Sequence, residues 1–154
     1  MTVFCEALIP GAIWGSAQTG ASDEANCVDR SFGASLEHYL GPRLDQLIFP
    51  ILDAFAASAQ EEAPVTPEVT QMAIDFASLL PLTVKLPEIS ADPDGEISFD
   101  WASASGKMFS VSVSSSGTLS YAGWFGEDSR VHGSEKLVGG VPEEILRGIQ
   151  KASR

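Results

Sequence analysis

The chain has 154 residues, of which 44% are hydrophobic and 19% are charged, and it contains two cysteines. This composition is too apolar for a wholly disordered chain and too poor in cysteine for a disulfide scaffold, and no apolar run reaches the ~20 residues that span a bilayer. A single domain covering residues 1–154 is therefore expected.

The negative charge is unevenly distributed along the chain, whose formal net charge is −12. Residues 1–66 hold two basic and nine acidic residues, residues 67–126 hold two and seven, and residues 127–154 hold five of each. Such a field repels nucleic-acid phosphates and anionic lipids and attracts a basic protein, although net charge also serves simply to keep a small protein in solution. A basic protein partner is expected, without direct nucleic-acid or membrane binding.

Residues 1–30 are rich in Gly, Ala and Ser and show no clear period. An irregular segment is predicted here, either packed on the core or ordered by a partner. Its apolar stretch resembles a signal peptide, but Glu6 stands where such a leader is positively charged. The prediction is a cytoplasmic protein in which Cys5 and Cys27 are thiols.

Helices are predicted over residues 35–81. Between residues 35 and 59, apolar side chains recur at steps of three and four, which places them on one helical face. Either one kinked helix or two helices meeting near Phe49 are predicted, because proline lacks the N–H that a helix interior needs. A break close to Pro50 is favoured. A second helix is expected to begin after Thr66, a good N-cap, and to end at Pro81.

Residues 82–125 are predicted to form an antiparallel β-meander. Apolar side chains alternate with Ser, Thr and acidic residues over three segments, and strict alternation is typical of half-buried strands. The separators contain Gly and have hairpin length. A shorter strand near residues 82–89 is expected before them, Gly126–Gly140 is expected to be a loop, and residues 141–152 a C-terminal helix. The three segments read EISFDWAS, KMFSVSVS and TLSYAGWF.

These elements define an α+β fold, in which the N-terminal helices pack on one face of a three- to four-stranded meander in a two-layer domain. Trp124 and Met108 have the parity of the polar sheet face, which Glu96 and Asp100 share. An exposed Trp is a plausible contact residue at an interface. Alternatively, a bulge at Gly123 turns Trp124 inward, or the N-terminal segment covers it.

No constellation for catalysis or cofactor binding emerges. The two histidines, His38 and His132, fit an ordinary helix and an ordinary loop, and no nucleophile elbow, metal-ligand spacing or phosphate loop occurs. The segment DPDG at residues 92–95 resembles a calcium loop, but its twelfth position would be Trp101 rather than a bidentate Glu. A turn ahead of a strand is predicted instead, and no catalytic residue, metal or cofactor is assigned.

The segment LPEISADPDGEISFDW, followed by FSVSV and SSSGTLSYAG, resembles a recurring segment of small uncharacterised bacterial proteins. In those proteins a Pro, a short turn, Asp-Gly and an Ile-x-x-x-Trp strand lead into a β-meander. The upstream helix TPEVTQMAIDFASLLP fits the same resemblance, which covers roughly residues 66–125. The resemblance implies an accessory or mobile-element product rather than a metabolic enzyme, and it implies no catalytic residues.

The leading hypothesis is a non-enzymatic acidic binding module that neutralises or escorts a basic protein, as an antitoxin, immunity protein or inhibitor does. Trp124, Met108, Glu96 and Asp100 are the expected partner-binding residues. Two alternatives stay open. One is a small enzyme or ligand-binding protein whose acidic residues assemble only in the fold, around a deep pocket that contains Asp92, Asp94, Asp100 or His132. The other is a DNA mimic that occupies a nucleic-acid-binding protein. No oligomeric state is assigned.

Overall fold

A computed structural model of the chain describes residues 41–127 and 129–154, all of which belong to the unit Leu36–Arg154. The predictions made for residues 1–30, for Cys5 and Cys27 and for His38 lie outside the described residues. Within the described residues no helix is long and apolar enough to cross a membrane.

Residues 41–57 are helical, and the helix runs unbroken through Pro50, so the predicted break there is wrong. The proline deprives the carbonyl of Gln46 of its helical partner. Gln46 is exposed, which lets water satisfy that carbonyl. Leu47 and Ile51 are buried on one face of the same helix, and this packing offsets the cost of the proline.

The turn after this helix and the start of α2 are fixed by side-chain hydrogen bonds. In the short 3-10 helix η1 (Ser58–Gln60), the buried Ser58 hydroxyl accepts the Val65 N–H at 2.9 Å. The helix α2 (Pro67–Leu79) begins where the sequence predicts, with the Thr66 hydroxyl accepting a hydrogen bond from the backbone N–H of Val69.

Five strands form one antiparallel sheet in the order β1-β2-β3-β4-β5. The class is α+β, as predicted, but the sheet has five strands rather than three or four. The first strand begins later than the expected segment 82–89, and the predicted loop Gly126–Gly140 contains the fifth. The strands are β1 (Glu88–Ala91), β2 (Ile97–Ala102), β3 (Met108–Val113), β4 (Thr118–Trp124) and β5 (Arg130–Lys136).

The strand β5 lacks the apolar alternation that predicts β2, β3 and β4. It reads RVHGSEK, is largely exposed and pairs with β4 along its whole length. Its glycine has a packing reason: a Cβ on Gly133 would lie 2.5 Å from the hydroxyl of Tyr121. Because β5 is a polar edge strand, its sequence resembles a loop.

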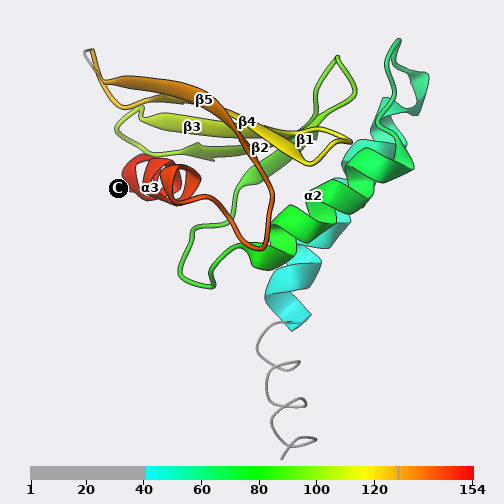
Figure 1. The fold of residues 1–154 in the computed structure, drawn as a ribbon, viewed down its shortest axis with the longest axis horizontal. Helices are drawn as coiled ribbons and strands as arrows, with labels where there is room; N and C mark the ends of the chain where they lie inside the picture. The colour runs from blue at the N-terminus through cyan, green and yellow to red at the C-terminus, as the bar shows by residue number, and fades with distance from the viewer. Residues whose placement is uncertain (1–40, 128) are drawn as a thin grey trace, which may run out of the picture. The chain divides into compact units, whose positions relative to one another are not determined.

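The helices α2 and α3 (Glu143–Ala152) pack on the same face of the sheet (Figure 1). The ring of Phe76 on α2 meets that of Phe99 on β2 at 5.0 Å, edge to face. The fully buried Trp101 donates its indole N–H to the carbonyl of Lys85 at 2.7 Å. A continuous aromatic core therefore lies between the helices and the sheet. The polar residues that alternate with the core residues along each strand face the opposite side of the sheet.

Candidate functional site

The sheet face opposite the helices carries two rows of side chains set by the strand register. One row runs across all five strands, and the next runs from β2 to β5. Met108 and Trp124 are direct neighbours in the second row, and 56% and 41% of their surfaces are exposed. The rows are Glu88, Asp100, Ser110, Ala122 and His132, and then Ala102, Met108, Trp124 and Arg130.

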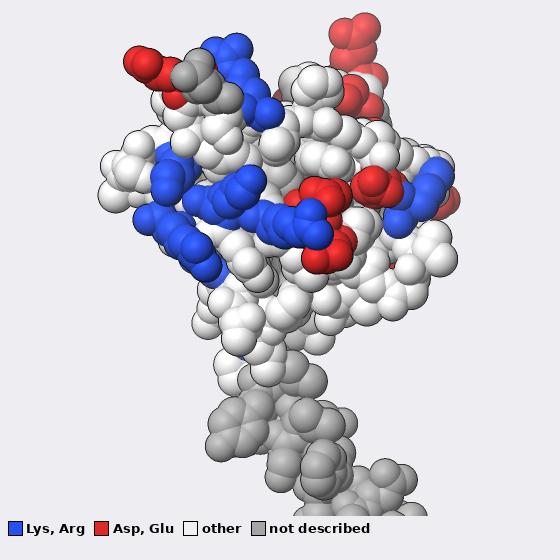
Figure 2. All heavy atoms as spheres, turned by 60° about the vertical axis from the view of Figure 1, so that its left-hand side comes forward, with Lys and Arg blue, Asp and Glu red and all other residues white. Residues whose placement is uncertain are grey.

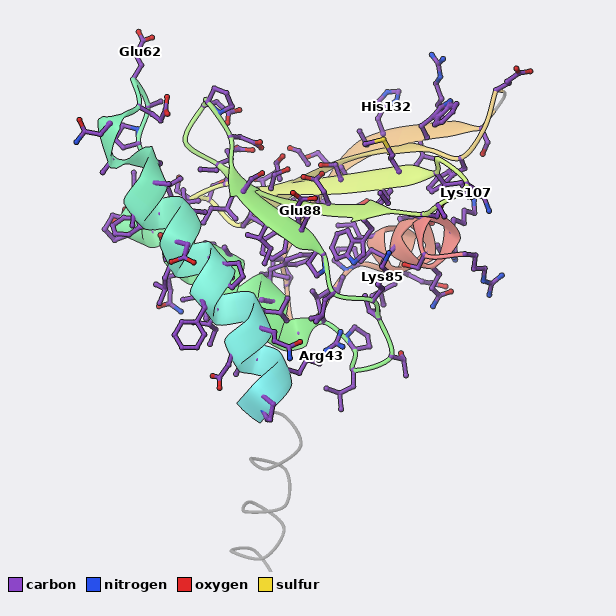
Figure 3. All side chains as sticks on the ribbon, turned by 180° about the vertical axis from the view of Figure 1, so that it is seen from behind. Arg43, Glu62, Lys85, Glu88, Lys107 and His132 are labelled. Carbon is purple, nitrogen blue, oxygen red and sulfur yellow. The ribbon has the colours of Figure 1, made fainter. Side chains whose placement is uncertain are left out.

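These two rows line a groove of about 900 Å³, here termed the sheet-face groove. Its charge changes sign across the sheet. The carboxylates of Glu88 and Asp100 come from β1 and β2, whereas the guanidinium of Arg130 and the imidazole of His132 come from β5. Glu88 and His132, which Figure 3 labels, come from the two opposite edge strands of the sheet. Lys85, which precedes β1, also lines the groove, and its ammonium group donates to the Ala102 carbonyl at 2.9 Å. The groove thus has a basic wall at β5 and, at β1 and β2, an acidic wall flanked by one lysine.

The centre of the groove is apolar. Met108, Ala122 and Trp124 lie between the two charged walls. Both Trp124 and Met108 occupy the face that their parity predicts, and β3 and β4 pair without interruption from Met108↔Trp124 to Val113↔Leu119. The alternative of a bulge at Gly123 that turns Trp124 inward is therefore wrong.

Asp100 joins Trp124 and Met108 in the sheet-face groove, but Glu96 does not. Glu96 closes the β1–β2 turn, where its carbonyl accepts the Asp92 N–H at 2.9 Å, and Gly95 adopts a φ of 83°. The predicted turn over residues 92–95 is present. Among the described residues, no group of His, Cys, Asp and Glu has the arrangement of a metal site.

The acidic residues of this turn perturb one another. Burial raises the pKa of the Asp92 carboxyl. The hydroxyl of Ser112, which donates a hydrogen bond to Asp92 at 2.9 Å, opposes this rise. Repulsion from the negative charges of Asp94 and Asp100 adds to the rise. Burial also raises the pKa of Glu96, to which Asp94 and Asp92 add repulsion. Negative charge is therefore concentrated beyond the acidic wall of the groove, at the β1–β2 end of the sheet.

Basic side chains gather on the opposite side, where α3 approaches β5 (Figure 2). Arg130, Arg147 and Lys151 line a cavity of about 370 Å³ there, together with Glu144. The Arg147 guanidinium is already paired with Glu143 and Glu144 at 2.7 and 2.8 Å. Its charge is thus largely compensated within α3.

The sequence did not assign Glu88 or Arg130 to a site, and it named His132 only as a pocket residue of the alternative enzyme or ligand-binding protein. Glu88 belongs to a strand that was predicted too early, and the other two to a strand that was predicted as a loop. His132 is consequently a sheet residue facing the groove, which corrects its assignment to a loop. Recognising β5 as a strand would have identified Arg130 and His132, because the even-numbered residues of β5 lie on the same sheet face as Trp124.

Comparisons with known proteins add no relative to this description. No protein-family model matches the chain, and neither the curated proteins nor the solved structures searched contain a match.

Proposed function

We propose that this protein is a non-enzymatic binding module that neutralises or escorts a basic protein, in the manner of an antitoxin, immunity protein or inhibitor. The observation that carries the proposal is the pair of exposed side chains Met108 and Trp124 at the centre of the sheet-face groove, next to the acidic wall of Glu88 and Asp100. Aromatic residues and methionine are enriched at the centres of protein interfaces.

Two physical effects act in sequence in this proposal. The net charge of −12 accelerates the approach of a basic partner, an effect that salt screens. Burial of Trp124 and Met108 then stabilises the complex, and truncating such an anchor typically costs ~2 kcal/mol or more of binding free energy, about thirtyfold in affinity. The acidic wall favours a cation of the partner at β1 and β2, while Arg130 favours a carboxylate at β5, which together set one orientation.

The proposal extends to the setting of the protein. The resemblance of residues 66–125 to small bacterial proteins favours a bacterial accessory protein acting in the cytoplasm. Glu96 contributes in this proposal as part of the charge at the β1–β2 end rather than as a groove residue, because it does not line the groove.

Affinity capture with the tagged full chain tests the proposal. In native lysate of the source organism at low salt, the wild type should retain a basic protein in stoichiometric amount, and less of it at high salt. Combined Trp124→Ser and Met108→Ser should abolish retention. Leu82→Ser is the matched control, since Leu82 is 53% exposed and does not line the groove. Absence of a stoichiometric partner at low salt, or its retention by the double variant, would contradict the proposal.

A second candidate function is the binding of a small ligand. The volume of the sheet-face groove, about 900 Å³, falls within the range of ligand pockets. Asp100, His132 and Arg130 would supply polar contacts on either side of an aromatic ligand resting on Trp124. A thermal-shift screen with charged aromatic molecules distinguishes the two candidates: stabilisation of the wild type that Trp124→Ser removes favours the ligand, and its absence favours the protein partner.

A further inference from the structure

Among the described residues, one edge of the strand β1 is unpaired, and the main-chain groups of two of its residues point outward from it. The Asp92 N–H donates a hydrogen bond to the Glu96 carbonyl across the β1–β2 turn. This bond shows which alternate residues of β1 are hydrogen-bonded to β2. In an antiparallel pair, alternate residues bond to the neighbour. Ser90 therefore bonds to β2, while the N–H and C=O of Ile89 and Ala91 point away from the sheet. No described strand or side chain pairs with these four groups.

The free edge of β1 faces a groove of about 530 Å³, here termed the β1-edge groove. Its opposite wall is the helix of residues 41–57, which runs beside β1 in Figure 3. The small side chains of Ala54 and Ala57 from this helix leave room next to Ile89 and Ala91. The groove is accordingly bounded by a main-chain hydrogen-bonding template on one side and small apolar side chains on the other.

The β1-edge groove is also strongly acidic. Asp53, Glu61 and Asp92 line it, and none of the described residues around it is a Lys, Arg or His. Glu88 lies on the outer side of the same strand, at the parity of Asp92. Because no cation among the described lining residues balances these carboxylates, the groove favours a cationic occupant over an anionic or neutral one.

The other edge of the sheet has the opposite character. The Leu137 N–H bonds to the Gly117 carbonyl, so the main-chain groups of Arg130, Ser134 and Lys136 point outward from β5. Lys and Arg on an exposed edge strand discourage strand pairing and repel a basic segment. An incoming basic strand is therefore directed to β1 and not to β5.

We propose that the β1-edge groove binds an extended basic segment of a partner protein, which adds to the sheet as a sixth strand. Main-chain groups of the segment pair with those of Ile89 and Ala91, and this supplies affinity without sequence preference. Alternate side chains of an added strand face opposite sides. Small apolar ones lie against Ala54 and Ala57, and basic ones lie on the side of Glu88 and Asp92. This site adjoins the sheet-face groove, with which it shares Ser90 and the charge of Glu88, but strand addition uses neither Trp124 nor Met108.

A capped seven-residue peptide of alternating lysine and valine is the probe. Isothermal titration with the full chain should show binding that weakens with salt. Methylation of the peptide's backbone amides, or replacement of its lysines by glutamates, should abolish binding, because the first removes the main-chain donors and the second reverses the charge. A peptide that binds equally well with methylated amides would overturn strand addition.

Proline substitutions on the protein give a matched pair. Ala91→Pro removes an outward N–H from β1 without touching the ladder to β2, a position where an edge strand tolerates proline. It should weaken peptide binding about tenfold, because one hydrogen bond to the peptide is lost and the proline ring hinders its approach. Ser134→Pro makes the same change on β5 and should leave binding unchanged. Equal effects of the two variants would overturn the proposal.

The charges are tested without altering the strand. Asp53→Asn combined with Glu61→Gln should weaken binding and flatten its salt dependence, because two of the three carboxylates that line the groove are removed. Both side chains are exposed, and neither makes a described hydrogen bond. Trp124→Ser should bind the peptide like the wild type, which separates failure here from failure of the proposed function. Sedimentation showing a dimer that Ala91→Pro dissociates would overturn the assignment, because a second copy would then occupy the edge.

Discussion

Replacing Gly148 by alanine tests directly how closely α3 packs on the sheet. Glycine in a helix interior costs ~1 kcal/mol relative to alanine, so in an undocked helix this substitution stabilises. In the structure, the added Cβ would collide with the ring of Phe109, which is 1% exposed and belongs to the hydrophobic core. Overpacking of this kind costs ~2 kcal/mol. The net expectation is a loss of about 1 kcal/mol and a fall in Tm of about 3 °C.

Thermal and urea unfolding of the full chain measure this change. Gly140→Ala is the control, because a Cβ there meets nothing within 4 Å, and its effect should stay within about 0.5 kcal/mol. Combining Gly148→Ala with Phe109→Leu should cost about 1 kcal/mol less than the sum of the two single variants, since the smaller side chain frees the space. A rise in Tm for Gly148→Ala would refute the packing of α3 on Phe109.

Four further substitutions give distinct outcomes. Asp92→Asn should raise the free energy of unfolding at pH 7 by ~0.5 kcal/mol. The pKa of the Asp92 carboxyl is raised in the fold, so the wild-type protein loses stability as the pH rises through that pKa and the carboxyl becomes charged. The asparagine variant avoids this loss. Its gain in Tm over the wild type should therefore shrink when the pH is lowered from 7 to 4. Trp124→Ser should change Tm little, whereas Trp101→Ala should cost ~4 kcal/mol on chemical unfolding. Gly95→Ala should lower stability by ~1 kcal/mol, because its φ is 83°.

The elements with strong periodicity could be predicted from the sequence. The strands β2, β3 and β4 alternate buried and polar side chains, and α2 begins at a Thr that caps it. Tertiary packing decided the two clear errors. Burial of Leu47 and Ile51 holds a helix through Pro50, and pairing with β4 orders a polar segment around Gly133 that has no apolar period of its own.

The candidate site was predicted only in part, for the same reason. The alternation of side chains along a single strand is enough to predict that Trp124 and Met108 are exposed. This prediction does not require the order or register of the neighbouring strands. The charged walls require the order of the strands and their register, which bring Asp100 opposite Glu88 and Arg130 opposite Trp124. Glu96 has the right parity but lies at the turn, and parity alone does not reveal how far a side chain lies from the groove.

Indole NMR of the complex tests the central claim most directly. The chain has three tryptophans, Trp14, Trp101 and Trp124, and each gives one indole N–H signal when the protein is labelled with ¹⁵N. A Trp124→Phe variant assigns the signal of interest. On addition of the basic protein captured from lysate, the Trp124 signal should shift or broaden, while that of the buried Trp101 stays in place. A complex that forms with the Trp124 signal unchanged would show that the open sheet face is not the binding surface.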